Sequence, residues 1–131
     1  MTLRVYLVED SPLVSERLRE LMQEEGAMIV GQSDTAATAI ADIESLRPDV
    51  VVVDIALREG TGFHVLKGID DSFDGHAPAR VVLTNFIREW YREAATRLGA
   101  DYFFDKSNQI PEMLGVLRAM NTSAGVEHAV M

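Results

Sequence analysis

Cysteine is absent from the 131 residues of this chain. Its absence excludes disulfide bonds, cysteine-ligated zinc, iron–sulfur clusters and thiol catalysis, and it fits a reducing compartment. Basic residues are scarce too, since 12 Lys and Arg stand against 21 Asp and Glu for a net charge of −9. Because cations that displace counterions from phosphates supply most nucleic-acid affinity, we expect no direct nucleic-acid binding by this chain.

Long hydrophobic runs are missing as well. No apolar stretch approaches the roughly 18 residues that indicate a membrane span, and the N-terminus lacks the basic start and apolar length of a signal peptide. We therefore expect a cytoplasmic chain that makes no contact with a membrane. Hydrophobic residues nevertheless make up 47% of the sequence, which at this length suffices for the core of one domain.

Short apolar segments alternate with segments whose apolar residues recur at helical spacing. The short segments are rich in β-branched and aromatic residues without polar alternation, which is typical of strands buried on both faces. Right-handed crossovers between such strands give an α/β fold, a doubly wound five-stranded parallel sheet with five helices on its two faces. The predicted strands are Leu3–Val8, Met28–Gly31, Asp49–Asp54, Arg80–Thr84 and Asp101–Phe104.

Acidic, hydroxyl and amine side chains stand where the predicted strands end. Because the carboxyl ends of parallel strands meet at one edge of the sheet, we expect these side chains to line one crevice. Three crowded carboxylates repel one another unless a cation neutralises them, and oxygen ligands of this kind favour Mg²⁺. The residues are Glu9 and Asp10 after the first strand, Asp54 at the end of the third, Thr84 at the end of the fourth and Lys106 after the fifth.

These residue types indicate transfer of a phosphoryl group to a carboxylate. Asp54 is the best acceptor, because it ends the most hydrophobic strand at the middle of the crevice, whereas Glu9 and Asp10 form a metal-binding pair. A lysine in the same crevice can bind phosphoryl oxygens by its charge, and a threonine can donate a hydrogen bond to one of them.

With these residues in this order, the sequence resembles a receiver domain of a two-component response regulator from Leu3 to about Met120. The resemblance implies a flavodoxin-like sheet of strand order 2-1-3-4-5. It implies that a histidine kinase or a histidine phosphotransfer protein phosphorylates Asp54. It also implies roles for the other residues: Glu9, Asp10, Asp54 and the Ala56 carbonyl hold Mg²⁺, Thr84 and Lys106 bind the phosphoryl oxygens, and Thr84 and Phe103 form the switch.

Four positions depart from the pattern of that family. Arg58 stands four residues after the phosphoacceptor, where proline is frequent, and Asn85 follows the switch threonine, where a small residue is usual. Phe103 lacks the hydroxyl group of the tyrosine found in many relatives. Ser107 replaces the common proline after the site lysine, so we expect no cis peptide bond there.

Trp90 indicates a surface for partners. Its neighbour Tyr91 takes the inward position of the predicted fourth helix, so the indole is expected to point outward. Exposed aromatic residues beside arginines are typical of interface cores. We therefore predict that a downstream protein, or a second copy in a homodimer, binds the fourth helix and fifth strand at Arg88, Trp90, Arg92, Arg97, Asp101 and Asp105.

We predict a signalling switch in a histidine-to-aspartate relay and not an enzyme acting on other molecules. One receiver domain is predicted over residues 1–120, followed by a flexible C-terminal tail over residues 121–131. Because this tail is too short for a DNA-binding or catalytic domain, output is expected through protein contacts. A receiver fragment of a DNA-binding transcriptional response regulator is the alternative, and a reading frame that continues past Met131 would decide it.

The acidic crevice is also compatible with two different classes of protein. A Mg²⁺-dependent phosphatase or phosphotransferase with an aspartyl-phosphate intermediate has a second aspartate two residues after the nucleophile, and here that position is Ala56. A phosphorylation-independent adaptor is disfavoured by the complete set of residues at the strand ends.

The residues beside the phosphoacceptor and the switch threonine bear on how long the phosphoryl group persists. Ala56 cannot hold a hydrolytic water and Phe86 would shield the phosphoryl group, so we expect slow self-dephosphorylation.

Overall fold

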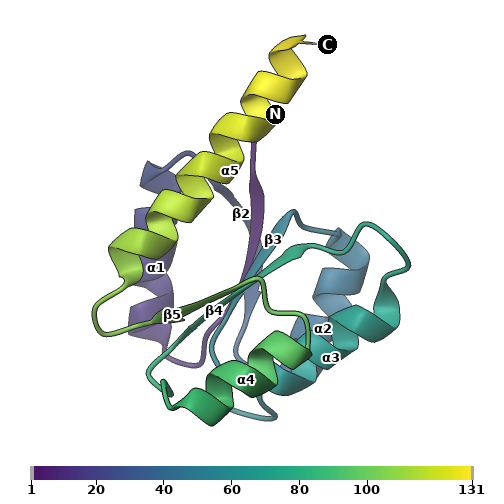
Figure 1. Ribbon diagram of the computed structural model, residues 1–131, viewed down its shortest axis with the longest axis vertical. Helices are drawn as coiled ribbons and strands as arrows, with labels where there is room; N and C mark the ends of the chain where they lie inside the picture. The colour runs from purple at the N-terminus through teal and green to yellow at the C-terminus, as the bar shows by residue number, and fades with distance from the viewer. Residues whose placement is uncertain (1, 131) are drawn as a thin grey trace.

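Five parallel strands form one sheet in the order β2-β1-β3-β4-β5 (Figure 1). The computed structural model describes the backbone of residues 2–130 and the side-chain surroundings of residues 2–122. The predicted flavodoxin-like α/β fold and its strand order are therefore confirmed. The strands are β1 (Arg4–Val8), β2 (Met28–Ser33), β3 (Val50–Val53), β4 (Ala79–Thr84) and β5 (Tyr102–Asp105), and the helices are α1 (Pro12–Glu24), α2 (Ala36–Leu46), α3 (Gly62–Ser72), α4 (Glu89–Arg97) and α5 (Ile110–Val130).

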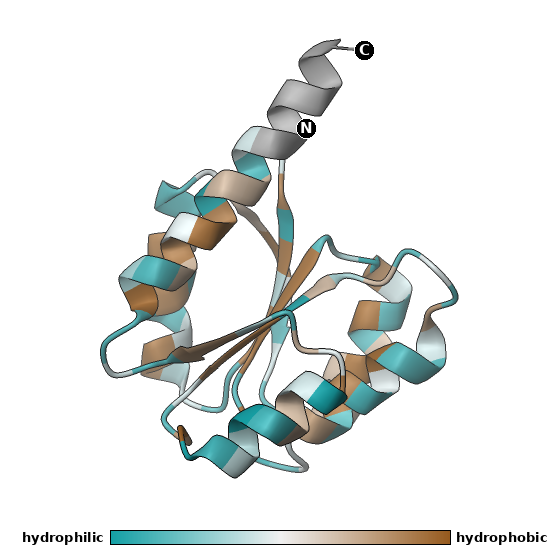
Figure 2. Cartoon of the chain, viewed as in Figure 1, coloured by the Kyte–Doolittle hydropathy of each residue, from teal (hydrophilic) through white to brown (hydrophobic). Residues whose placement is uncertain are grey.

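Helices cover both faces of the sheet. Figure 1 shows α1 and α5 on one side and α2, α3 and α4 on the other. Alternate residues of β3 point to opposite faces, so that Val51 and Val53 belong to the core under α2, α3 and α4, whereas Val50 and Val52 belong to the core under α1 and α5. All four are buried, and Figure 2 shows apolar residues along the strands and on the helix faces that meet them. This double burial explains the uninterrupted apolar run in the sequence.

Side-chain caps start three of the helices. Ser11 accepts a hydrogen bond from the Val14 amide, and Pro12 occupies the first turn of α1, where no amide donor is needed. Thr35 and Thr61 cap α2 and α3 in the same way. These caps fix where each helix leaves the edge of the sheet at which the strands end.

The C-terminal end of α4 is tied to α3 and β4 by a buried arginine. Arg80 of β4 donates from Nη1 to Asp70 Oδ1 at 2.7 Å and to the carbonyl of Leu98 at 3.1 Å. Gly99 follows with φ of 92° and lies against the guanidinium, so a Cβ at this position would clash with Arg80. A glycine is therefore required here both for its conformation and for its lack of a side chain.

Helix α5 runs to Val130 and so continues beyond Met120, where the sequence pattern predicts the end of the last helix. Asn121 takes part in the fold, because its Oδ1 accepts a hydrogen bond from the Leu3 amide at 3.0 Å. The side chains of residues 123–130 and all of Met131 lie outside the described residues, and the flexibility of residues 121–131 stays a prediction. None of the described helices combines the length and apolar character that crossing a membrane requires.

Candidate functional site

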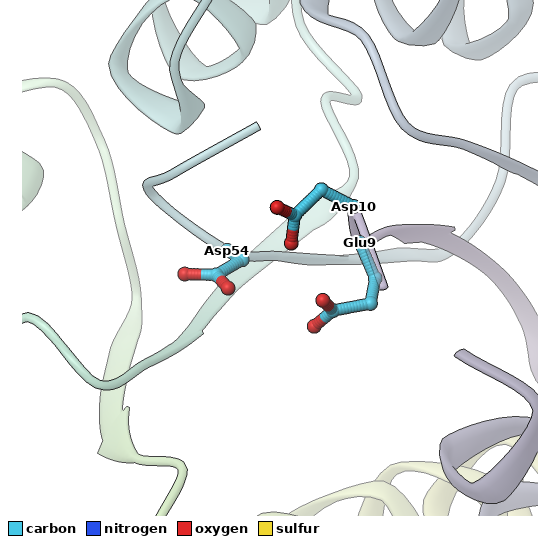
Figure 3. Close-up of side chains that lie close together, drawn as sticks. All are labelled: Glu9, Asp10 and Asp54. Atoms are coloured by element: carbon cyan, nitrogen blue, oxygen red, sulfur yellow. The ribbon is translucent and has the colours of Figure 1, made fainter. Parts of the chain in front are cut away.

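Three carboxylates meet where β1 and β3 end. These strands are neighbours, with Val8 opposite Val53, so the residues that follow them emerge side by side. One carboxylate oxygen from each of Glu9, Asp10 and Asp54 lies within 4.8 Å of the other two, and Figure 3 shows the three side chains together. The structure thus brings together the residues that the sequence pattern predicts as metal ligands.

Lys106 reaches the two buried carboxylates from the loop after β5. Its Nζ donates to Glu9 Oε1 at 2.6 Å and to Asp54 Oδ2 at 2.5 Å. The side chains are 11% exposed for Lys106, 2% for Glu9 and 7% for Asp54, so these ion pairs are shielded from water. Three carboxylates and one ammonium group leave two negative charges unbalanced, which one divalent cation would neutralise.

Backbone amides donate to the second carboxylate oxygen of Glu9 and of Asp54. The amide of Ser11 donates to Glu9 Oε2 at 3.1 Å, and the amide of Ile55 donates to Asp54 Oδ1 at 2.6 Å. These donors hold both carboxyl groups in fixed orientations.

The pKa values of two site residues shift in ways that reflect this burial. Burial raises the pKa of Glu9, and the nearby charge of Asp54 adds to this rise, although the hydrogen bond from Lys106 opposes it. Burial lowers the pKa of Lys106, but its hydrogen bonds to Asp54 and Glu9 outweigh that effect, so the pKa is raised overall. Lys106 therefore stays charged. The hydrogen bonds that Glu9 accepts from Lys106 and from the Ser11 amide offset only part of the rise in its pKa.

Thr84 lies at the end of β4 and is fully buried. Its Oγ1 accepts a hydrogen bond from the Phe86 amide at 3.1 Å, and its carbonyl accepts one from the Lys106 amide at 2.9 Å. The hydroxyl proton is not used in the bond with Phe86, so Thr84 can still donate to an oxygen placed in the crevice.

Phe103 on β5 is partly buried beneath an arginine of α4. The guanidinium of Arg92 lies 4.6 Å from the centre of the Phe103 ring and donates from Nη1 to the Phe103 carbonyl at 3.4 Å. Arg92 therefore holds the ring against β5, and a rotation of Phe103 would have to break this cation–π contact.

The loop after Asp54 is held by contacts that the sequence pattern does not predict. Arg58 donates to both carboxylate oxygens of Asp34, at 2.8 Å and 3.3 Å, and its amide donates to the Asp34 carbonyl at 2.9 Å. Ala56 pairs with Thr61 in an isolated bridge. The arginine that stands where relatives often have proline thus fixes this loop to the one after β2.

A second unexpected contact joins the loops after β4 and β5. Ser107 Oγ donates to Asn85 Oδ1 at 3.0 Å. Both residues are positions at which the sequence departs from the receiver pattern. The peptide bond between Lys106 and Ser107 is trans.

The predicted partner surface is divided between exposed residues and residues held by the fold. Trp90 is 56% exposed and stacks on Tyr91 with ring centres 4.0 Å apart. Asp101 Oδ2 accepts the Arg80 amide, and Asp105 Oδ1 accepts the Ser107 amide. The prediction of this surface left out two exposed apolar residues of the loop before α4, Phe86 and Ile87, and the Phe86 ring lies 5.3 Å from that of Tyr91. Arg88, Arg97 and Asp101 are also exposed, whereas Arg92 and Asp105 are only partly exposed.

Comparison with known proteins gives one family. The protein-family model described as "Response regulator receiver domain" matches residues 5–118 of this chain. The chain is 36% identical over 85 residues to "Transcriptional regulatory protein BtsR" of Salmonella typhi, a match that covers 64% of this chain and 34% of that protein. The chain thus spans only about a third of the length of this curated relative.

Solved structures agree in fold. A two-component response regulator of the LuxR family from Aurantimonas sp. SI85-9A1 has a TM-score of 0.83 and 27% identity, covering 94% of this chain and 87% of that chain. The receiver domain of the sensor histidine kinase PA1611 from Pseudomonas aeruginosa PAO1 has a TM-score of 0.79 and 19% identity, covering 91% of this chain and 97% of that chain.

Proposed function

The chain belongs to the response regulator receiver domain family, and we propose that it is a phosphorylation switch whose phosphoacceptor is Asp54. The observation that carries this proposal is a buried carboxylate held between Lys106 and the Ile55 amide, with Glu9 and Asp10 beside it. A histidine kinase or a histidine phosphotransfer protein is the proposed donor. The chain then acts as a signalling switch and not as an enzyme for other substrates.

Mg²⁺ is the proposed cofactor. The site offers only oxygen ligands from Glu9, Asp10 and Asp54, and its two unbalanced negative charges match one divalent cation. The Ala56 carbonyl is proposed as a further ligand. In the similar Pseudomonas receiver domain a magnesium ion is coordinated in the active site cleft. When bound, such an ion would offset the charge that builds up on the transferred phosphoryl oxygens.

The residues of this chain divide the work of the transfer. A carboxylate oxygen of Asp54 attacks phosphorus, so that a P–O bond forms as the P–N bond to the donor histidine breaks and the imidazole keeps the bonding electron pair. Lys106, already within hydrogen-bond distance of Asp54 Oδ2, then pairs with a phosphoryl oxygen. We propose that the Thr84 hydroxyl moves toward the crevice and donates to another phosphoryl oxygen.

We propose that the signal leaves through α4 and β5. Phosphorylation adds about −1.5 to −2 charges, and the protein responds through the groups that contact the new oxygens. An inward movement of Thr84 draws the loop after β4 with it and alters the contact between Arg92 and Phe103. The exposed residues next to that loop, including Arg88 and Trp90, would form the surface for a downstream protein or a second copy.

The second candidate is the same switch as the receiver part of a DNA-binding transcriptional response regulator. This is favoured by the relative BtsR, a transcriptional regulatory protein of which the match covers only 34%. A gene sequence that encodes further residues after Met131 would support it. A stop codon at that point would support the single-domain form.

The decisive experiment is incubation with Mg²⁺ and acetyl phosphate, followed by intact mass measurement. We expect a gain of one phosphoryl group in the wild type and none in Asp54→Asn or in the presence of a chelator. Asp74→Asn, which changes an exposed aspartate in the loop before β4, is the matched control and should be labelled like the wild type. Labelling of Asp54→Asn would refute the assignment.

A further inference from the structure

We infer that the hydrogen bond between Ser107 and Asn85 is a latch that holds the loop after β4 in its unphosphorylated position and thereby weakens binding of the phosphoryl group. The inference rests on the proposed function, because it concerns how Thr84 reaches a phosphoryl group on Asp54. The two residues of the latch touch neither the proposed metal ligands nor Asp54 in any hydrogen bond of the described residues. They act as positioning residues.

The latch connects the immediate neighbours of the two groups proposed to bind phosphoryl oxygens. Asn85 follows Thr84, and Ser107 follows Lys106. Ser107 Oγ donates to Asn85 Oδ1 at 3.0 Å, while the Lys106 amide donates to the Thr84 carbonyl at 2.9 Å. The two loops are therefore linked by a backbone bond at the sheet and by a side-chain bond one residue beyond it.

The Ser107 end of the latch is fixed. Its amide donates to Asp105 Oδ1 at 2.8 Å. The amide of Asp105 in turn donates to Gln109 Oε1 at 2.8 Å, and the Gln109 amide donates to the Asp105 carbonyl at 2.8 Å. These bonds form a closed turn between β5 and α5, so Ser107 cannot follow a displacement of the neighbouring loop without breaking them.

The Asn85 end belongs to a loop that can move. Residues 85–88 are all exposed, and Arg88 starts α4 without a side-chain cap. The Phe86 amide is bonded to the Thr84 hydroxyl, so this bond moves together with Thr84. Beyond the backbone bond at the sheet, the latch is therefore the side-chain hydrogen bond that ties this loop to the turn after β5.

Movement of Thr84 toward Asp54 separates the two ends of the latch. Consecutive Cα atoms are about 3.8 Å apart, so a displacement of the Thr84 backbone carries Asn85 with it while Ser107 remains fixed. The bond is then made only in the unphosphorylated form, and an interaction confined to one of two states shifts their equilibrium toward that state. For one neutral hydrogen bond near the surface, the shift is about threefold to fivefold.

Beryllofluoride with Mg²⁺, a stable mimic of the phosphoryl group on a carboxylate, provides the test. Its affinity is measured by fluorine NMR titration of the full chain, as wild type, Asn85→Ala, Ser107→Ala, the double variant and Ser107→Thr. We expect each alanine variant to bind about threefold to fivefold more tightly and the double variant to bind no more tightly than either. Ser107→Thr retains the hydroxyl group and should match the wild type.

Different failures point to different steps. Tighter binding by Asn85→Ala alone would mean that its bulk obstructs the site, and the latch would be refuted. Unchanged or weaker binding in both single variants, additive effects in the double variant, or tighter binding by Ser107→Thr would refute it equally. If the wild type binds no beryllofluoride in the presence of Mg²⁺, the proposed phosphoacceptor role of Asp54 itself fails, and the latch falls with it.

Discussion

Replacing Asp10 by Asn should stabilise the protein without divalent metal and destabilise it relative to wild type when Mg²⁺ is present. Asp10 is exposed, and its carboxylate lies within 4.8 Å of those of Glu9 and Asp54, whereas Lys106 bonds only the other two. At the high dielectric of an exposed site, each like-charge pair at this distance repels by about 1 kcal/mol. Attraction to the ammonium group of Lys106 offsets about one pair, so Asp10→Asn should raise the free energy of unfolding by about 1 kcal/mol.

Mg²⁺ should reverse this order. A ligand at one hundred times its dissociation constant stabilises the folded state by about 2.7 kcal/mol, and a variant that lacks one of three carboxylates gains much less. At that Mg²⁺ concentration we expect the wild type to exceed Asp10→Asn by about 1 kcal/mol. The two stabilities therefore cross as the metal is added.

Urea denaturation, followed by circular dichroism at low ionic strength, measures both stabilities in chelator and in Mg²⁺. Added salt should shrink the difference in chelator, because it screens exposed charges. Asp74→Asn removes an exposed carboxylate elsewhere and should change neither value. A lower stability of Asp10→Asn in chelator, or equal stabilisation of both proteins by Mg²⁺, would refute the argument from crowded carboxylates.

Four further substitutions test three separate parts of the structure. The buried Tyr6 hydroxyl donates to Asp42 at 2.6 Å, and burial together with this bond raises the pKa of Tyr6. The contribution of the Tyr6 hydroxyl to stability is thus complete below about pH 10 and is lost as the pH rises through the pKa of Tyr6 in the folded state. Tyr6→Phe should therefore lower the free energy of unfolding, measured by urea denaturation, by about 1.5 kcal/mol at neutral pH and by progressively less above about pH 10. Trp90→Ala should weaken binding to a partner or a second copy, measured by sedimentation, while shifting the free energy of unfolding by less than about 1 kcal/mol because the indole is 56% exposed; a larger loss of stability would assign Trp90 to the core. Ala56→Asn and Phe86→Lys should each speed the loss of phosphate from Asp54 after the donor is removed, as measured by intact mass. Unchanged decay in both variants would show that another part of the site sets the lifetime of the phosphoryl group.

The sequence sufficed for the sheet and for the meeting of the acidic residues, since both follow from general rules. The run Val50–Val53 could be only a strand buried on both faces, and parallel strands must end at one edge of the sheet. Asp54 could therefore be placed at the same edge of the sheet as Glu9 and Asp10 from the order of the residues alone. The resemblance to receiver domains added the strand order and the individual roles.

Contacts between loops could not be predicted in this way. The pairs Arg58 with Asp34 and Ser107 with Asn85 join segments that no periodicity relates, and each depends on the rotamers of both partners. The length of α5 was missed for a different reason. Beyond Met120 the apolar spacing fades into polar residues, although Asn121 is held by the Leu3 amide and the helix continues through it.

Helix α4 is held more firmly at its C-terminal end than at its N-terminal end. Arg80 bonds the carbonyl of Leu98, directly after the helix, whereas the opposite end begins at Arg88 without a side-chain cap. The helix runs from Glu89 to Arg97 and is about 13 Å long, at about 1.5 Å per residue. In the proposed switch, a push on the loop before α4 would tilt the helix about a pivot near Leu98, and Trp90, near its start, would travel farther than Arg97. A small displacement beside Asp54 would in this way be enlarged at Trp90, the most exposed aromatic side chain of the described residues.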